Sequence, residues 1–166
     1  MRRGFRGEFD QKVDGKGRIS IPADFRGPIE AGDPDWSRGK AQRFIIVYGN
    51  SKQAHLECYT IEAAAEVEEK ISRLPRGSMQ RKTLERLFSG YSLECTVDET
   101  GRIVLPLRLR KKIGLDGMAY FIASGDTFQI WKPETFEAVE LQKADEWLEQ
   151  FPDDFDPLTL LDQVGE

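Results

Sequence analysis

The sequence predicts an α+β fold in which one β-hairpin unit occurs twice. Residues 13–22, VDGKGRISIP, return as residues 97–106, VDETGRIVLP, and six of the ten positions are identical. At about 6 % chance identity per position, such a match has odds on the order of one in ten thousand. Strand-like alternation and glycine-containing turns mark both copies, and amphipathic helical patterns follow them. The chain therefore carries one structural unit twice.

The first copy opens with an expected strand over residues 5–13, in which apolar side chains recur every four positions. Residues 14–17, Asp-Gly-Lys-Gly, predict a turn, because two glycines can take the positive φ that a tight hairpin requires. Residues 18–21 alternate polar and apolar side chains, as a half-buried strand does. Pro22 suits the first position of a short helix, and Gly27 suits its end.

The second copy repeats this plan. We expect a strand at 91–97, a turn, a strand at 102–105 and a short helical turn that stops at Gly114. Each copy then continues into a further pair of strands joined by turn residues. These pairs cover residues 44–48 and 56–59 in the first copy, and residues 118–123 and 127–131 in the second.

Helical patterns follow both strand pairs. The first begins at Thr60, a good N-cap, and runs to Leu74 with one apolar face. Ser78 is the expected cap of another helix, and Pro133 opens the helix of the second copy. In that last helix we expect three apolar residues to be buried: Phe136, Val139 and Trp147.

The first copy also contains an insertion, residues 28–43, which we expect to be a loop with Trp36 partly buried. The domain organisation predicted from these patterns has three parts. Residues 5–74 form the first repeat, and residues 75–150 form the connecting helix and the second repeat. Residues 151–166 form an acidic, proline-broken, irregular tail.

Composition excludes several function classes. Of 166 residues, 39 % are hydrophobic and 32 % charged, which is typical of a soluble globular protein of one domain or two small ones. No apolar run approaches the roughly 20 residues that a membrane helix needs. The start of the chain carries positive charge without an apolar stretch after it, unlike a secretory signal. We therefore expect a cytoplasmic protein that does not engage a membrane.

The sequence shows no sign of a metal, a cofactor or a catalytic centre. Cys58 and Cys95 lie far apart without a Cys-x-x-Cys pattern, and His55 is the single histidine. Residues 15–17, Gly-Lys-Gly, lack the spacing of a P-loop or a dinucleotide fingerprint. With no nucleophile signature either, we expect neither an enzyme nor a small-molecule substrate.

The net charge is −5, but the charges are unevenly distributed. Residues 1–26 carry seven cations against four carboxylates, and residues 76–112 carry nine against four. Residues 133–166 carry one lysine against eleven carboxylates. Because salt screens charges beyond about 10 Å, the local field counts for more than the total. The duplicated units are therefore basic and suit nucleic acid.

The two Asp-x-x-x-Arg turns allow two interpretations. In the structural one, Asp14 pairs with Arg18 across the first hairpin and Asp98 with Arg102 across the second, while Gly17 and Gly101 permit the bend. We favour this interpretation for the aspartates. In the functional one, each tip presents free N–H groups and nearby cations to phosphate.

Cations around the first turn make it the better anion site. Lys16 stands at its tip, and Arg2, Arg3 and Arg6 precede it on the expected strand. Such a cluster can sit on a DNA backbone while one or two arginines reach guanine edges. The second tip has Glu-Thr at residues 99–100 instead of Gly-Lys, so we expect the first copy to make most of the DNA contact.

The run FRGEF at residues 5–9, followed by residues 13–22, resembles the start of the bacterial MraZ proteins. The second Asp-x-x-Gly-Arg turn, its spacing and the chain length also match, so the resemblance covers residues 5–150. It implies a duplicated swapped-hairpin β-barrel, related to the AbrB type. Two internal repeats with flanking helices would supply both half-barrels from one chain.

The resemblance also implies a homo-oligomeric ring that regulates transcription, expected to act as a repressor. It would bind direct repeats of promoter DNA upstream of the division and cell-wall gene cluster, its own promoter included, and would lie at the nucleoid. The family's DNA surface maps onto Arg2 or Arg3, Arg6, Lys16 and Arg18, with Arg102 less securely.

An alternative function is open at this point. Antitoxins that share the swapped-hairpin fold bind a protein partner through an acidic tail, and this chain's tail mixes Phe151, Phe155 and Leu158 with carboxylates. Deleting residues 152–166 separates the two hypotheses. DNA binding should survive the deletion under the first, and partner binding should vanish under the second.

Overall fold

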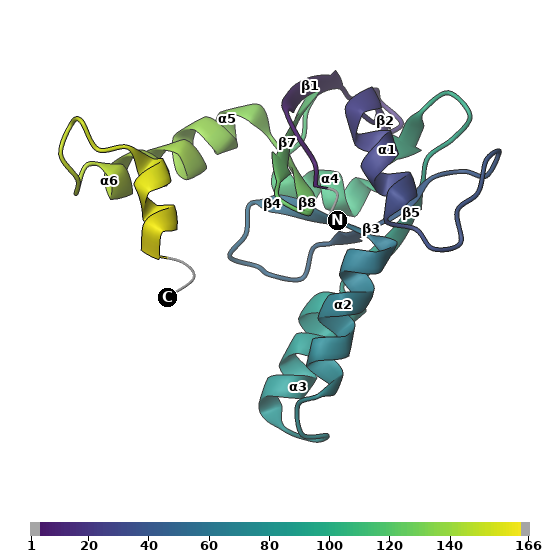
Figure 1. Cartoon of the computed structure of the whole chain (residues 1–166). Helices are drawn as coiled ribbons and strands as arrows, with labels where there is room; N and C mark the ends of the chain where they lie inside the picture. Colours follow the sequence, from purple (N-terminus) through teal and green to yellow (C-terminus); the bar gives the residue numbers. More distant parts are fainter. Residues whose placement is uncertain (1–3, 164–166) are drawn as a thin grey trace. The chain divides into compact units, whose positions relative to one another are not determined.

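The structure, a computed structural model, describes residues 4–163 and has an α+β fold (Figure 1). The chain divides into two compact units, residues 1–133 and residues 134–166. The strands are β1 (Glu8–Lys12), β2 (Arg18–Ser20), β3 (Arg43–Val47), β4 (His55–Thr60), β5 (Ser92–Thr96), β6 (Arg102–Val104), β7 (Met118–Ser124) and β8 (Thr127–Trp131). The helical elements are α1 (Ala23–Ala31), α2 (Ile61–Ser72), α3 (Met79–Leu84), η1 (Glu85–Gly90), α4 (Leu107–Ile113), α5 (Pro133–Thr135), η2 (Phe136–Leu141), α6 (Gln142–Leu148) and η3 (Pro157–Gln163).

Six strands form one antiparallel sheet in the order β1-β7-β8-β4-β3-β5, and β2 and β6 form a separate ribbon. The two copies interleave, since β1 pairs with β7, β5 pairs with β3, and β4 pairs with β8 at the centre. When each strand is exchanged for its counterpart in the other copy (β1 for β5, β3 for β7, β4 for β8), the same strand order results, read from the other edge. Neither copy forms this sheet from its own strands alone.

The expected barrel needs correction, because the sheet of the described residues does not close. β1 and β5 lie at its two edges. β2 does not pair with β1 in a ladder: an isolated bridge joins Ile19 of β2 to Val13, the residue just after β1. With three residues each, β2 and β6 pair with one another and leave both edges of the large sheet unjoined.

An aromatic core joins the sheet to α1. Phe25 of α1 is fully buried and packs against Phe5, Phe9 and Phe128, with ring centroids 4.9–5.4 Å apart. Pairs of this geometry stabilise by about 0.5–1.5 kcal/mol beyond the area that they bury. On the ribbon, Ile19 and its counterpart Ile103 enter the same core, so one face of the ribbon is inward and the other is exposed.

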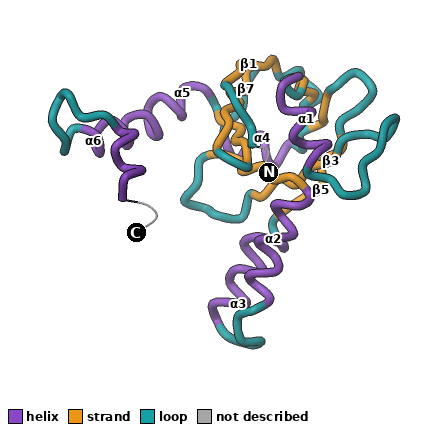
Figure 2. Tube along the Cα trace, viewed as in Figure 1, coloured by secondary structure: helices purple, strands orange, loops and turns teal. Residues whose placement is uncertain are grey.

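Two helices extend from the sheet side by side (Figures 1 and 2). α2 begins where the sequence predicts, because the Thr60 hydroxyl accepts a hydrogen bond from the Ala63 amide at 3.0 Å. Ser78 caps α3 in the same way, through the Arg81 amide. Phe88 of η1 closes a second apolar cluster between these helices and the sheet.

The insertion of the first copy differs from the prediction at its start. α1 continues through Pro28 to Ala31 instead of ending at Gly27, because Ile29 in that last turn is fully buried. Burying such a side chain is worth about 1.5–3 kcal/mol, which favours the added turn. Only the residues between α1 and β3 form the loop.

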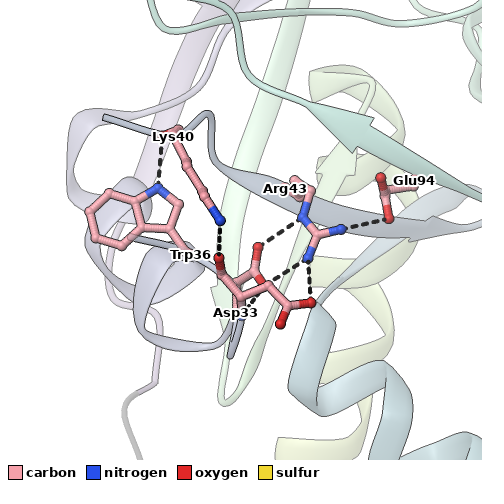
Figure 3. Close-up of polar contacts among 6 residues, drawn as sticks. Asp33, Trp36, Lys40, Arg43 and Glu94 are labelled. Atoms are coloured by element: carbon pink, nitrogen blue, oxygen red, sulfur yellow. Dashed lines mark hydrogen bonds and ion pairs between the residues drawn. The ribbon is translucent and has the colours of Figure 1, made fainter. Parts of the chain in front are cut away.

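An ion-pair network anchors this loop (Figure 3). Arg43 of β3 donates two hydrogen bonds to the buried Asp33 carboxylate, at 2.9 and 2.8 Å, and a third to Glu94 of β5 at 3.4 Å. The half-buried Trp36 donates its indole N–H to the Lys40 carbonyl at 2.8 Å. The loop is therefore tied to the strands β3 and β5.

The C-terminal unit corrects another expectation. A helical stretch does start at Pro133, but none of the described residues 134–163 is buried. Phe136 and Val139 are half-buried, and Trp147 is 46 % exposed. A segment this short has too little apolar surface to enclose a core of its own.

The tail is only partly irregular. Residues 151–156 form no regular structure, as expected, but Pro157–Gln163 form a 3₁₀ helix. Asp156 starts this helix, because its carboxylate accepts a hydrogen bond from the Leu158 amide at 3.0 Å. Phe151 and Phe155 stack with their ring centroids 4.1 Å apart.

Candidate nucleic-acid interface

The first turn, residues 14–17, is held by one carboxylate. The Asp14 side chain accepts hydrogen bonds from the amides of Lys16 and Arg18 at 3.0 and 2.9 Å, and from Nε of Arg18 at 2.5 Å. The bond from the Arg18 amide is the main reason why the pKa of Asp14 lies below its ordinary value. These amides are therefore engaged within the turn, and a phosphate there would be held by the side chains of Lys16 and Arg18.

The second turn, residues 98–101, has the same plan with one difference. Asp98 accepts hydrogen bonds from the amides of Thr100 and Arg102 at 2.8 and 3.0 Å, and the Arg102 amide is the main cause of its lowered pKa. Here Nε of Arg102 donates to the Thr100 hydroxyl at 2.8 Å and lies 3.6 Å from Asp98. Thr100 thus comes between the arginine and the carboxylate.

Each turn needs its glycine. Gly17 and Gly101 have φ of +83° and +81°, a region that other residues rarely adopt. A Cβ on Gly17 would lie 2.5 Å from the Leu105 carbonyl oxygen, and one on Gly101 would overlap the Arg26 guanidinium. Both bends are therefore packed against the opposite copy.

The contact between the copies is reciprocal. The Gly17 carbonyl accepts a hydrogen bond from the Leu105 amide, and the Gly101 carbonyl accepts one from the Ile21 amide, both at 2.8 Å. An arginine of the helix after each ribbon strand donates to the residue that follows that strand: Nη2 of Arg26 donates to the Ile21 carbonyl at 3.4 Å. Nε of Arg110 donates to the Leu105 carbonyl at 2.9 Å. Hydrogen bonds therefore join the two strands of the ribbon to both turns and to the helices that follow.

The exposed face of this ribbon carries both motif arginines. Arg18 is opposite Val104, and Arg102 is opposite Ser20. Because Ile19 and Ile103 point inward, these four residues share the outer face. Arg18 and Arg102 occupy diagonal positions, for which Cα atoms lie about 7–8 Å apart. Their side chains are 40 % and 38 % exposed.

The expected cation cluster at the first turn is wrong with respect to Arg6. The Phe5 amide bonds to the Gly125 carbonyl, and the Gly7 carbonyl accepts from the Ala123 amide, so Arg6 lies beside the end of β7. The turn begins eight residues after Arg6, beyond the opposite end of β1, which is roughly 26 Å at strand spacing. Arg2 and Arg3 fall outside the described residues.

Alternation in residues 18–21 and 102–105 indicates which side chains of each strand face outward, including Ser20 and Val104. The residues alone favour a local hairpin, so they did not predict that β2 pairs with β6; an exchange between the repeats was expected only from the family resemblance. The short segments carry no signal for a partner more than 80 residues away.

Other kinds of site find little support in the described part of the chain. Residues 4–163 contain no group of three or more His, Cys, Asp or Glu side chains placed to hold a metal ion. No helix there combines the length and apolarity needed to cross a bilayer. Burial raises the pKa of both free thiols, Cys58 and Cys95, and so disfavours the thiolate.

Fold and site together define a small α+β protein with an antiparallel sheet and an exposed two-stranded ribbon, beside which lie two Asp-x-x-x-Arg turns. The family model described as "MraZ protein, putative antitoxin-like" matches residues 87–155. The chain belongs to the MraZ family, because relatives of that name are 32–61 % identical to it over 92–99 % of its length.

Relatives match over nearly the whole chain. The "Transcriptional regulator MraZ" of Ruegeria sp. (strain TM1040) is 61 % identical over 165 residues, and that of Ruegeria pomeroyi is 57 % identical, each covering 99 % of both chains. The protein of the same name from Coxiella burnetii (strain Dugway 5J108-111) is 32 % identical over 156 residues, covering 92 % of this chain and 95 % of its own.

Proposed function

We propose that this protein is a sequence-specific, DNA-binding transcriptional regulator that acts by binding and not by catalysis. The observation that carries the proposal is the β2–β6 ribbon, with Arg18 and Arg102 on its exposed face. The relatives are named transcriptional regulators, which supports the same function here. We expect a cytoplasmic protein that associates with the nucleoid.

The ribbon has the shape and chemistry that DNA recognition needs. The major groove of B-DNA admits a two-stranded β-ribbon, and arginine can bind the O6 and N7 atoms of guanine with two hydrogen bonds. Arg18 and Arg102 use Nε inside their turns, and their terminal amino groups have no partner among residues 4–163. Lys16 is exposed beside them and can bind a phosphate.

The two turns should contribute unequally. Lys16 at the first tip is a cation, whereas the second tip has Glu99 and Thr100 at the corresponding positions. Glu99 repels phosphate, and Thr100 already holds Arg102. We propose that the first copy makes most of the DNA contact, and that Arg2, Arg3 and Arg6 add contacts outside the ribbon.

The finer fold belongs to the same proposal. We interpret the interleaved strands as a swapped-hairpin duplication, in which residues 5–74 and 75–150 are the two repeats and residues 151–166 a tail. The exchange-symmetric strand order and the reciprocal hydrogen bonds between Gly17, Leu105, Gly101 and Ile21 support it.

Assembly into a homo-oligomeric ring would explain how a small interface selects one promoter. Several ribbons on one rigid ring raise the effective concentration and can increase avidity by roughly 10² to 10⁴. Direct repeats spaced to match the subunits would be chosen over single sites. We propose that such repeats lie in the protein's own promoter, ahead of the division and cell-wall genes, and that binding represses transcription.

The test is a footprint and a binding titration on the chain's own upstream DNA. Arg18→Ala should weaken specific binding by about 1–3 kcal/mol and relax sequence preference. Lys16→Gln should weaken binding to all DNA sequences alike and lower the slope of log affinity against log salt concentration by about 1. Arg73→Gln at the exposed residue just after α2 is the matched control, since it also removes one cation.

Folding must be checked, because Nε of Arg18 also bonds to Asp14. Lys16 has no such partner among the described residues, so Lys16→Gln keeps the test informative if Arg18→Ala unfolds. Specific binding that ignored salt, or that survived both changes in folded protein, would contradict the proposal.

A second function has one observation in its favour. The C-terminal unit is strongly acidic, has no buried residue among those described, and exposes Trp147 beside the stacked Phe151 and Phe155. Such a segment suits a basic protein partner, as in an antitoxin-like module. Deleting residues 152–166 should leave DNA binding intact under the main proposal. Loss of a copurifying protein partner on deletion would favour the second.

A further inference from the structure

The helices that follow the two halves of the ribbon differ sharply in charge. α4 contains four cations and no carboxylate: Arg108, Arg110, Lys111 and Lys112. Its counterpart α1 contains Arg26, flanked by Asp24 and Glu30. The folds of the two copies correspond, but these charges do not, so packing does not explain the basic helix.

The four cations of α4 form a basic band, which starts beside the first turn at Arg110. Leu109 and Ile113 are buried, which fixes the inward side of the helix. At 100° per residue, Arg110 then lies on one flank, Lys111 faces outward, and Arg108 shares the other flank with Lys112. Nε of Arg110 bonds to the Leu105 carbonyl, the same residue whose amide bonds to Gly17 of the first turn.

The far flank of α4 meets the loop between β3 and β4. The Lys112 ammonium donates to the carbonyls of Asn50 and Gln53 at 3.3 and 3.1 Å. Together with Tyr48, Tyr91 and Lys52, Lys112 lines an open hollow of about 530 Å³. The residues that line this hollow include two lysines and no carboxylate, so the band continues beyond the helix.

Arg108 is held in position although it is exposed. Its Nη2 donates to the Tyr48 hydroxyl at 2.8 Å, and its guanidinium carbon lies 5.2 Å from the Tyr48 ring centroid. A guanidinium has five N–H donors, of which this bond uses one. An arginine stacked on an aromatic ring loses little further freedom when it binds a phosphate. Tyr48 therefore acts as a positioning residue.

We propose that α4 and the β3–β4 loop form a second DNA-backbone contact beside the first turn, in which Arg108, oriented by Tyr48, binds a phosphate and Lys111 adds charge. This contact rests on the proposed function and deepens it. α1 lacks the corresponding cations, so the contact is one-sided. Each chain consequently has a preferred direction along the duplex, which direct repeats satisfy and inverted repeats do not.

The experiment measures binding to a specific duplex and to a scrambled duplex, each over a range of salt. The double variant Arg108→Gln with Lys111→Gln should weaken binding to both duplexes alike, by about tenfold. It should also lower the salt slope by about 0.9 per lost phosphate contact. The matched control is Lys70→Gln on α2 with Arg73→Gln just after it, which removes the same charge and should change the slope far less.

Two single variants distinguish a phosphate contact positioned by Tyr48 from an effect of net charge alone. Tyr48→Phe keeps the ring but removes the hydroxyl, and should weaken binding severalfold without changing net charge. Asp24→Arg places a cation on α1 at the position that corresponds to Arg108, and should tighten binding to both duplexes. If Tyr48→Phe has no effect, Arg108 is not positioned as proposed.

The outcomes distinguish this inference from the function on which it rests. If wild-type protein shows no preference for its upstream DNA, the proposed function fails. If that preference holds but the α4 variants bind like the α2 control, the second contact alone is refuted. A changed oligomeric state with unchanged DNA affinity would assign the band to a protein contact instead, and would also overturn the inference.

Discussion

Replacing Gly17 by alanine should destabilise the fold, whereas the same change at Gly15 in the same turn should not. Gly17 has φ of +83° and packs against the other copy, so a side chain there meets both backbone strain and a neighbour. Gly15 does not have a positive φ, and a Cβ there would meet nothing within 4 Å. The two glycines therefore form a matched pair.

The magnitude follows from two contributions. The left-handed conformation costs a residue with a Cβ roughly 1–2 kcal/mol. The new Cβ would lie 2.5 Å from the Leu105 carbonyl oxygen, so the strands must separate and weaken the bond from the Leu105 amide to the Gly17 carbonyl. Such a bond is worth about 0.5–1.5 kcal/mol. Together these give about 1.5–3.5 kcal/mol for Gly17→Ala, or about 3–14 °C in Tm for a chain of this size.

Thermal unfolding followed by circular dichroism measures this difference. Protein concentration must be the same for all variants, because self-association makes Tm depend on concentration. Gly15→Ala should stay within about 0.5 kcal/mol of wild type. Gly101→Ala should lose less stability than Gly17→Ala, because its Cβ would meet the end of the flexible Arg26 side chain and not a backbone carbonyl. Equal losses at Gly15 and Gly17 would refute the reasoning, since only one of them is braced against the opposite copy.

Three further changes have defined outcomes. Phe25→Ala removes a fully buried ring from the core and should cost about 3–5 kcal/mol in urea denaturation. Glu57→Ala leaves side-chain donors of β8 without their acceptor and should cost about 2–4 kcal/mol in the same assay, with Glu57→Gln less severe. The hydrogen bonds from Arg43 are the main reason why the pKa of Asp33 is lowered. Asp33 therefore contributes its full stabilisation above its unfolded-state pKa of about 3.9. This stabilisation is lost as the pH falls through the lower folded-state pKa. Asp33→Asn should therefore lower the urea midpoint at pH 7 and flatten its fall below about pH 4; an unchanged midpoint at pH 7 would contradict this.

Local patterns predicted much of this structure. Thr60 and Ser78 cap helices where capping chemistry places them, and Gly17 and Gly101 bend the chain where a positive φ is required. Each of these features depends on a residue's own side chain and its nearest neighbours along the chain. The extent of α1 was harder to predict, because the burial of Ile29 against distant strands outweighs the local signal to stop.

The candidate site divides in the same way. The aspartate–arginine turns follow from spacing alone, since four residues suffice to bring Asp14 to Arg18. That Arg18 shares a face with Arg102 does not follow, because it depends on which strand pairs with which. The separation of Arg6 from the turn likewise depends on the direction in which β1 runs along β7.

Propensity and periodicity act over a few residues, so the repeated motif, the class of each element and the residues that bend both turns are predictable from the amino-acid sequence. The register between the copies, the open sheet and the contact of Arg108 with Tyr48, just after β3, required the three-dimensional structure. Pairing between distant segments depends on the total free energy of burying both copies together, which no short stretch of chain encodes.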